Sequence, residues 1–358
     1  MAYATISKPS LHFNTLTYGG NDASGRAITG VGFQPDWSWF KDRSNAVNHS
    51  IFDSVRGVTK NIVSNTNAAE STSAQGLQAF GTDGFTLGSD GDVNGNNNNY
   101  ASWNWKAGTT SGITTTGSTI TPSAYSFNAT AGFSIIKYNG NSGGSGYSAL
   151  IPHGLGVAPK CVIVKQLNHG TENWGIYHDG LNSGSSPQTK TIFLNKQDDE
   201  YGATNMWYDT APTTVNFSVG TNDIVNNTNA DYIAYCFAEI KGYSKFGFYK
   251  GNGVDDGAFV YTGFKPAFLM IKNTSSNSTK WTICDNKREG FNAKNYRLFA
   301  SETDAESTSN AWEMYSNGFK MTTTGSFVNA AGSNYIYLAF AEEPLVANVG
   351  QSIPATAR

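Results

Sequence analysis

The sequence predicts an all-β protein made of three tandem antiparallel β-sandwich domains of the jelly-roll type. A phrase in which Gly and Pro precede a short apolar run ending at Lys occurs at residues 32–41, 154–165 and 263–272. A second, aromatic-rich phrase follows each copy, at residues 99–106, 231–239 and 334–342. The resulting period of about 110 to 120 residues exceeds the about 20 to 50 of solenoid repeats, so it indicates tandem domains.

Composition agrees with this interpretation. Aromatic residues make up 13 % of the chain, with 18 Tyr and 21 Phe. Such side chains fit the half-buried pleated surface of a sheet, and no convincing amphipathic helical stripe accompanies them. The length of 358 residues accommodates three domains of the usual size of about 100 to 150 residues.

Charge and cysteine usage exclude several classes of function. Only 14 % of the residues are charged and the net charge is −3, so nothing predicts binding to nucleic acid or to an anionic membrane. No apolar run approaches the about 18 residues of a membrane span, and the N-terminus does not resemble a secretory signal. We therefore expect a soluble protein made in a cytoplasm. Cys161, Cys236 and Cys284 lie in strand-like runs at unrelated spacings, which predicts buried, reduced thiols.

The repeats and the linkers between them predict the domain boundaries. Residues 1–10 are expected to form an N-terminal arm and residues 11–108 the first sandwich. A Gly/Ser/Thr linker at 109–130 suggests that this domain sits apart from the second, at 131–242, and the third, at 243–343. Residues 344–358 form a C-terminal arm that is either disordered or ordered against a neighbouring subunit.

Within each domain the closing strand is expected to lie centrally and to be buried on both faces, because residues such as 335–341 are apolar at nearly every position. Asp53 with Arg56, and Asp285 with Arg288, follow a strand at a spacing that predicts an ion pair across a turn. Asp-Gly and Asn-Gly pairs at 83–84 and 317–318 predict hairpins.

Residues with catalytic or metal-binding potential are few. His178 and Asp179 form the only adjacent pair of His and acid, and a turn is a simpler interpretation than a catalytic dyad. Asp90, Asp92 and Asn94 match the first half of a calcium loop, but Ala101 occupies the position of the bidentate Glu. The loop is therefore either a weak calcium site or a solvated Asx-rich turn.

Aromatic residues supply the remaining candidates. Trp37 with Trp39, and Trp103 with Trp105, alternate along strands, so each pair shares a face and forms either core or a platform for sugar rings. The other four tryptophans precede turns or stand alone, which predicts exposure. With Tyr208 they make up the predicted glycan-binding set: Trp174, Trp207, Tyr208, Trp281 and Trp312.

The chain resembles a family of virion proteins from tailed phages of marine bacteria, including cyanobacterial phages. The phrases that carry the resemblance extend over nearly the whole chain, at residues 28–43, 53–57, 83–95, 103–108, 153–160 and 335–342. The resemblance implies concanavalin A-like, lectin-like jelly rolls on the surface of a phage particle. It supplies no catalytic residue.

The expected function is therefore non-enzymatic: a tail fibre, tail appendage or head decoration that acts in particle assembly and host attachment. Expected partners are capsid, portal or tail proteins and further copies of the chain, with a trimer favoured, and a host surface glycan. No cofactor is expected beyond the calcium site. The alternatives are a free carbohydrate-binding module and a polysaccharide depolymerase, which would need two carboxylates about 5 to 9.5 Å apart.

Overall fold

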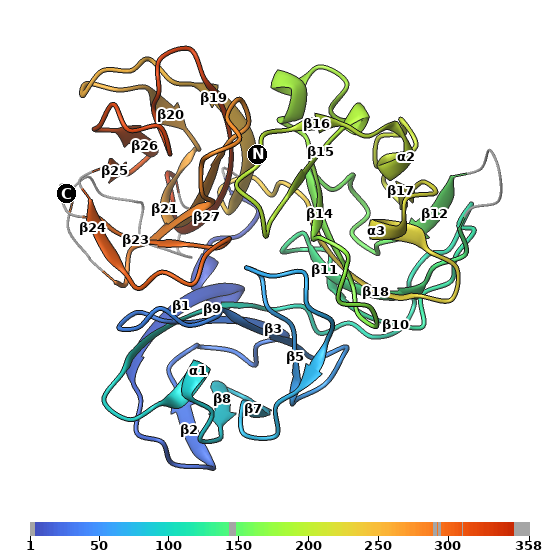
Figure 1. Ribbon diagram of the computed structural model, residues 1–358, viewed down its shortest axis with the longest axis horizontal. Coiled ribbons are helices and arrows are strands. Elements are labelled where there is room, and N and C mark those ends of the chain that lie inside the picture. The colour runs from blue at the N-terminus through green and yellow to red at the C-terminus, as the bar shows by residue number, and fades with distance from the viewer. Residues whose placement is uncertain (1–3, 143–147, 289–291, 293–294, 310, 347–358) are drawn as a thin grey trace.

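The computed structural model describes residues 4–142, 148–288, 292, 295–309 and 311–346, and within them the protein is built from antiparallel sheets. Three units, at residues 13–105, 124–237 and 244–344, surround a common middle (Figure 1). They are called units 1, 2 and 3 below. The all-β prediction is confirmed. No helix in the described part of the chain has the length and apolar character that a membrane crossing requires.

Unit 1 has a four-stranded main sheet in the order β1-β9-β3-β4, so its last strand lies between its first two. A second sheet has the order β2-β8-β7, and β5 pairs with β6. A single-turn helix, α1, precedes β9. The bounds are β1 Phe13–Gly19, β2 Arg26–Thr29, β3 Trp37–Asp42, β4 Ser50–Asp53, β5 Lys60–Asn61, β6 Ser71–Thr72, β7 Leu77–Gly81, β8 Gly84–Leu87, α1 Gly91–Asn94 and β9 Asn99–Trp105.

Unit 2 repeats this order as β11-β18-β13-β14 and extends the sheet with β10 on one side and β15 and β16 on the other. Its second sheet is the pair β12-β17. The bounds are β10 Ala124–Asn128, β11 Phe133–Asn139, β12 Ala149–Pro152, β13 Cys161–Gln166, β14 Gly175–His178, η2 Leu181–Gly184, η3 Pro187–Thr189, β15 Lys190–Phe193, β16 Tyr201–Gly202, α2 Thr204–Trp207, β17 Asn216–Val219, α3 Asp223–Asn226 and β18 Asp231–Phe237.

Unit 3 has the main sheet β19-β27-β21-β22-β23-β24 and the second sheet β20-β26-β25. Four neighbouring strands therefore have the same order in all three main sheets. An opening strand (β1, β11 or β19) is followed by the closing strand of the unit (β9, β18 or β27), and then by two further strands in chain order. The bounds are β19 Ser244–Lys250, β20 Phe259–Tyr261, β21 Phe264–Asn273, β22 Thr282–Asp285, β23 Asn295–Phe299, β24 Ser307–Ser309, β25 Trp312–Tyr315, β26 Gly318–Met321 and β27 Asn334–Pro344.

Each main sheet is buried on both faces. Its outer face packs on the second sheet of the same unit, around a local core such as that of Phe40, Phe52 and Phe85 in unit 1. Its inner face meets the other two units, and Figure 1 shows the second sheets on the outside of the molecule. The predicted central position and two-sided burial of the closing strands, β9, β18 and β27, is confirmed.

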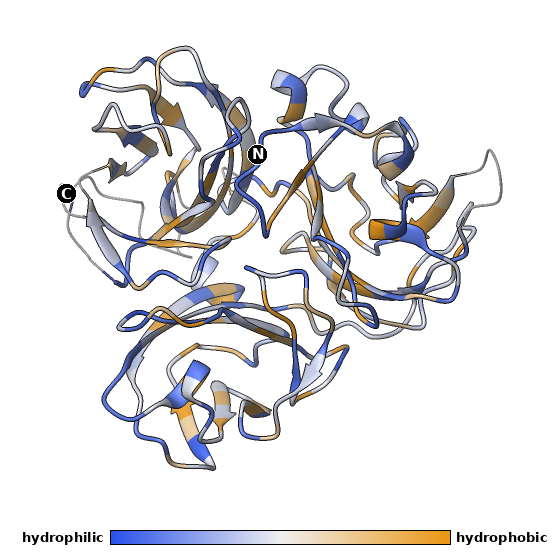
Figure 2. Ribbon diagram, in the orientation of Figure 1, coloured by the Kyte–Doolittle hydropathy of each residue, from blue (hydrophilic) through white to orange (hydrophobic). Residues whose placement is uncertain are grey.

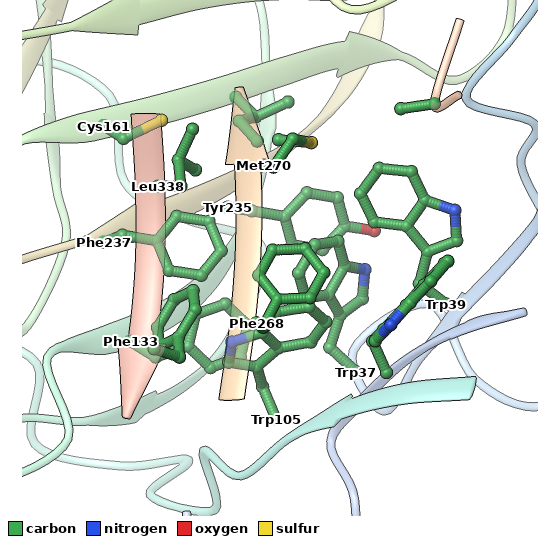
Figure 3. Packing of buried hydrophobic residues seen from close by; sticks show 14 of the residues in the cluster. Trp37, Trp39, Trp105, Phe133, Cys161, Tyr235, Phe237, Phe268, Met270 and Leu338 are labelled. Atoms are coloured by element: carbon green, nitrogen blue, oxygen red, sulfur yellow. The ribbon is translucent and has the colours of Figure 1, made fainter. Parts of the chain in front are cut away.

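The inner faces meet in one shared hydrophobic core (Figure 3). Trp37 and Trp105 come from unit 1, Tyr235 from unit 2 and Phe340 from unit 3. The ring centroids of Trp37 and Tyr235 lie 4.6 Å apart, and those of Trp105 and Phe340 lie 5.5 Å apart. In Figure 2 these inner strands carry much of the hydrophobic colour, whereas the outer loops are mostly hydrophilic. The four tryptophans of unit 1 therefore form core, one of the two alternatives.

The connecting segments also pack on the body. Ala4 and Ile6 are buried, and η1 (Pro9–Leu11) lies against β1 and β27, so the described part of the predicted N-terminal arm belongs to the fold. The predicted linker runs along unit 2, where Ile120 is buried. The expectation that the first unit sits apart is wrong, because its inner face is covered by the other two units. Of the predicted C-terminal arm, residues 347–358 lie outside the described residues.

Candidate functional site

Four of the five predicted glycan-binding residues are buried, so the prediction of their exposure is wrong. Trp174, Trp281 and Trp312 have no exposed surface and Trp207 is 2 % exposed. Trp207 and Trp312 fill the local cores of units 2 and 3. Only Tyr208 is exposed, at 38 %. A sugar ring can stack on an aromatic face only where that face is open, which leaves Tyr208 alone among the five.

Trp174 and Trp281 instead join neighbouring units. Each stands directly before the third strand of a main sheet and donates its indole N–H across a unit boundary. The Trp174 Nε1 atom lies 3.0 Å from the Val63 oxygen, and the Trp281 Nε1 atom lies 2.8 Å from the Phe193 oxygen. The sequence analysis predicted that these tryptophans are exposed because they precede turns or stand alone. The sequence does not show that a neighbouring unit covers them.

His49 occupies the matching position in unit 1, directly before β4. Its Nδ1 atom accepts the indole N–H of Trp39 at 2.8 Å, which leaves the proton on Nε2. That Nε2–H donates to the Phe299 oxygen of unit 3 at 3.0 Å. Units 1, 2 and 3 thus bind to units 3, 1 and 2 in turn, and the contacts form a closed ring.

A second ring lies at the end of the same strands. Asp53 of unit 1 accepts the Tyr235 hydroxyl of unit 2 at 2.7 Å, and Asp285 of unit 3 accepts the Trp103 indole N–H of unit 1 at 2.9 Å. His178 has the matching place in unit 2 and lies 3.1 Å from the Tyr337 oxygen of unit 3. All three boundaries therefore contain a second buried polar contact.

The two predicted ion pairs are confirmed. The Arg56 and Asp53 side chains approach to 2.5 Å, and those of Arg288 and Asp285 to 2.6 Å, with both pairs fully buried. Burial alone would raise the pKa of the Asp285 carboxyl, but the guanidinium of Arg288 holds it below its ordinary value. A buried carboxylate that remains charged can accept the hydrogen bond from the neighbouring unit.

His178 and Asp179 do not form a catalytic dyad. The His178 Nδ1 atom accepts the Gly180 backbone N–H at 3.0 Å, so the proton lies on Nε2 and points to Tyr337. Asp179 turns away and pairs with Lys160 at 2.8 Å. Burial lowers the pKa of His178 to about 4, partly offset by its hydrogen bond to the Tyr337 oxygen.

Two of the three predicted calcium ligands, Asp90 and Asn94, already make hydrogen bonds within the protein. The Asp90 side chain caps α1, and the Asn94 amide is fully buried. The Asn94 oxygen accepts from Arg26 at 2.7 Å, and its nitrogen donates to the Gly88 oxygen at 2.8 Å. Within the described residues no group of three or more His, Cys, Asp or Glu is placed to hold a metal ion. The calcium site stays a prediction, but a cation bound through Asn94 would have to displace these bonds.

Asn94 belongs to a repeated motif that sequence reasoning missed. Asn94, Asn226 and Asn329 each follow Val and each precede a Tyr by six positions. Each side-chain oxygen accepts the backbone N–H of an Asn after the first strand, at 3.2, 2.9 and 3.0 Å. The six-residue spacing between the Asn and the Tyr occurs in all three units, and this spacing could have revealed the motif from the sequence. The hydrogen bonds of its Asn side chain are called the Asn lock below.

The tyrosines of the motif lie in three stacked pairs. Tyr18 with Tyr100, Tyr138 with Tyr232 and Tyr249 with Tyr335 have centroid distances of 5.3, 5.1 and 4.9 Å. The first hydroxyl of each pair donates to the oxygen of the Val in the motif. In each unit the first strand is therefore fastened to the turn that precedes the last strand.

The Lys that ends each repeated phrase is buried as well. The Nζ atoms of Lys165 and Lys272 donate to backbone oxygens of the preceding unit, Asn67 at 3.2 Å and Gln197 at 2.8 Å. Burial lowers the pKa of Lys165 to about 8 and that of Lys272 to about 7. These ammonium groups lie among carbonyl oxygens, so they serve the unit boundaries.

A cleft of about 550 Å³ lies where units 1 and 2 meet, and it contains Asp36, Ser54, Tyr125 and Ser126. The Asp36 carboxylate accepts the Ser54 hydroxyl at 2.8 Å and the Ala107 backbone N–H at 2.8 Å. Burial raises the pKa of Asp36, and these hydrogen bonds counteract the rise. Asp36 therefore mainly fastens the segment that leaves β9.

We expect Asn94→Ala to lower the free energy of unfolding by about 2 to 4 kcal/mol, because it leaves several buried partners without hydrogen bonds. The exposed neighbour Asn96 supplies the matched control, and Asn96→Ala should change stability by less than about 0.5 kcal/mol. Urea denaturation followed by circular dichroism measures both. Equal stability of the two variants would contradict the structural role of Asn94.

Stability should fall as the pH drops from about 6.5 to 4. The folded-state pKa of His178 is about 4, below the 6.5 of the unfolded chain, so protons bind the unfolded state preferentially in this interval. His178 alone should remove about 3 kcal/mol at pH 4.

Thermal unfolding at a series of pH values measures this loss. His178→Gln should be less stable than the wild type at pH 7 yet lose less stability on acidification. His169→Gln, at an exposed site, should follow the wild-type curve. A parallel pH dependence for His178→Gln and the wild type would rule out this assignment.

A family model described as Domain of unknown function (DUF7483) covers residues 8–344, which is most of the chain and all three units. No curated protein and no solved structure matches.

Proposed function

The chain belongs to the DUF7483 domain family over residues 8–344, and we propose that it is a non-enzymatic structural protein on the surface of a tailed-phage particle. It would be a tail fibre, a tail appendage or a head decoration. The observation that carries the proposal is the closure of three units around one core. Contacts buried at all three boundaries hold the three units of one chain together, which suits a component exposed on the outside of a particle.

The phrases that resemble marine phage virion proteins support the same assignment. They coincide with the parts that build the closed body: residues 28–43 include β3, and residues 335–342 lie in β27. Polar residues that the sequence analysis singled out also serve the fold. Asp53, His178 and Asp285 lie at unit boundaries, and Asn94 fastens two loops of unit 1.

The proposal includes lectin-like jelly-roll units. Support comes from the strand order first, last, second, third in each main sheet and from the second sheet that packs on its outer face. Two antiparallel sheets with distant strands paired are the arrangement from which jelly rolls are built. The three units would then have the same strand order because each is a copy of one β-sandwich.

Attachment to a host glycan would use the outer loops, since the inner faces are buried. Tyr208 is exposed, and both it and Asp209 have left-handed backbone conformations, with φ of 52° and 48°. Such conformations are costly for residues other than glycine and often accompany function. Particles carrying Tyr208→Ala should therefore adsorb less well to host cells than particles carrying Tyr201→Ala, a control at an equally exposed tyrosine.

Electron microscopy tests the particle assignment directly. Particles of the phage that encodes the chain are purified and incubated with gold-labelled antibody against the protein. We expect label at repeated positions on the particle surface, because a structural component occupies fixed sites.

Particles from a phage with the gene deleted supply the control and should carry no label. Protein recovered only from the soluble fraction of the lysate, and never with particles, would refute the proposal. If that soluble protein bound host polysaccharide, the free carbohydrate-binding alternative would replace it. Release of reducing ends from the polysaccharide would instead identify a depolymerase.

A further inference from the structure

A buried carboxylate lines the cleft where units 1 and 2 meet. Asp36, which directly precedes β3, is 5 % exposed and belongs to this cleft of about 550 Å³. The buried carboxylates of Asp53 and Asp285 each pair with an arginine. Within the described ranges, no lysine or arginine forms an ion pair with Asp36. Hydrogen-bond donors are therefore the main compensation for its charge.

One oxygen of this carboxylate retains an acceptor site. Oδ1 accepts the hydroxyl groups of Ser54 at 2.8 Å and Ser126 at 3.4 Å, whereas Oδ2 accepts only the Ala107 backbone N–H, at 2.8 Å, among the described groups. Each carboxylate oxygen has about two lone-pair sites. Gly108 has a φ of 112°, which favours glycine, and a Cβ atom there would lie 3.9 Å from Oδ2. The absence of a side chain at this position leaves room beside Oδ2.

Uncharged polar groups make up much of the remaining lining. Gln34 and Thr110 are exposed, and neither side chain makes a hydrogen bond to another described residue. The Ser54 hydroxyl donates to Asp36, which leaves its oxygen as an acceptor. Tyr125 adds a half-buried aromatic side chain. The lining therefore offers both donors and acceptors, and Asp36 carries its one charge.

The fold does not require an acid at this position, because the matching positions of units 2 and 3 differ. Asp36, Lys160 and Ala267 correspond, since the backbone oxygen of each accepts the N–H of the residue after β4, β14 or β22, at 2.8, 2.8 and 2.9 Å. In unit 2, Lys160 pairs with Asp179 at 2.8 Å. In unit 3, Ala267 has no polar side chain. At these three positions, a carboxylate without a cation occurs in unit 1 alone.

The lining suits an uncharged ligand that carries several hydroxyl groups. One hydroxyl can donate to Oδ2 of Asp36, while a neighbouring hydroxyl donates to the Ser54 oxygen or pairs with the Gln34 amide. An anionic ligand would be repelled by Asp36, and a metal ion would find one carboxylate among the lining residues. Pockets of about 300 to 1,000 Å³ with a few placed polar groups are typical of small-molecule sites, often at domain interfaces.

We propose that this cleft binds a neutral saccharide unit. Asp36 Oδ2 accepts a ring hydroxyl, Ser54 and Gln34 bind a neighbouring hydroxyl, and Tyr125 packs against the apolar face of the sugar ring. The site is separate from Tyr208, and it is a property of the chain itself. The inference therefore holds whether or not the chain belongs to a phage particle.

An array of neutral, acidic and amino oligosaccharides, probed with the fluorescently labelled full chain, tests the proposal. We expect binding to neutral oligosaccharides, unchanged by EDTA. Isothermal titration calorimetry then measures the affinity for the neutral oligosaccharide with the strongest array signal. Asp36→Asn should weaken this affinity at least about 10-fold, because a hydrogen bond to a charged acceptor is lost.

Thr110→Trp fills the cleft from an exposed position, so it should weaken binding at least as much while the thermal unfolding temperature stays near that of the wild type. Thr115→Trp, at an exposed site outside the lining, is the matched control and should bind as the wild type does. Equal affinity of Thr110→Trp and Thr115→Trp would overturn the proposal. Absence of binding to neutral oligosaccharides, binding confined to charged ones, or loss of binding in EDTA would also overturn it.

Discussion

Burial of the main sheets on both faces is the constraint on which the rest of the structure depends. The outer face of each sheet is covered by its own unit, but the inner face presents aromatic residues that a single sandwich cannot cover. Trp37, Tyr235 and Phe340 illustrate the solution, since each comes from a different unit and all lie in one core. Because apolar burial is the main favourable term in folding, we expect closure of the three units to stabilise each of them.

Polar groups then determine how the units fit together. Buried hydrogen bonds contribute only about 0.5 to 1.5 kcal/mol each, but an unpaired buried group costs about 1 to 3 kcal/mol. The indole of Trp174 and the imidazole of His178 are satisfied only when the neighbouring unit lies at the observed position. Such contacts specify one arrangement of units, whereas the aromatic core would tolerate several.

The sequence predicted much of each unit but not the closure. The repeated phrases located β3, β13 and β21, and the Asp and Arg spacing indicated both ion pairs. Exposure was wrong for Trp174 and Trp281, because their partners are carbonyl groups of another unit that no local pattern reveals. The spacing of six residues between the Asn of each Val-Asn pair and the following Tyr was visible in the sequence. It could have identified the Asn lock, that is, the buried hydrogen bonds of Asn94. The trimer, the glycan and the particle partners stay predictions.

Differential scanning calorimetry of the full chain tests the central claim most directly. If one core serves three units, the chain should unfold in a single transition whose van't Hoff enthalpy equals the calorimetric enthalpy. Phe340→Ala, which opens a cavity in the shared core, should lower the temperature of that whole transition. Two or three separate transitions, or a shift confined to one of them in the variant, would contradict a single closed body.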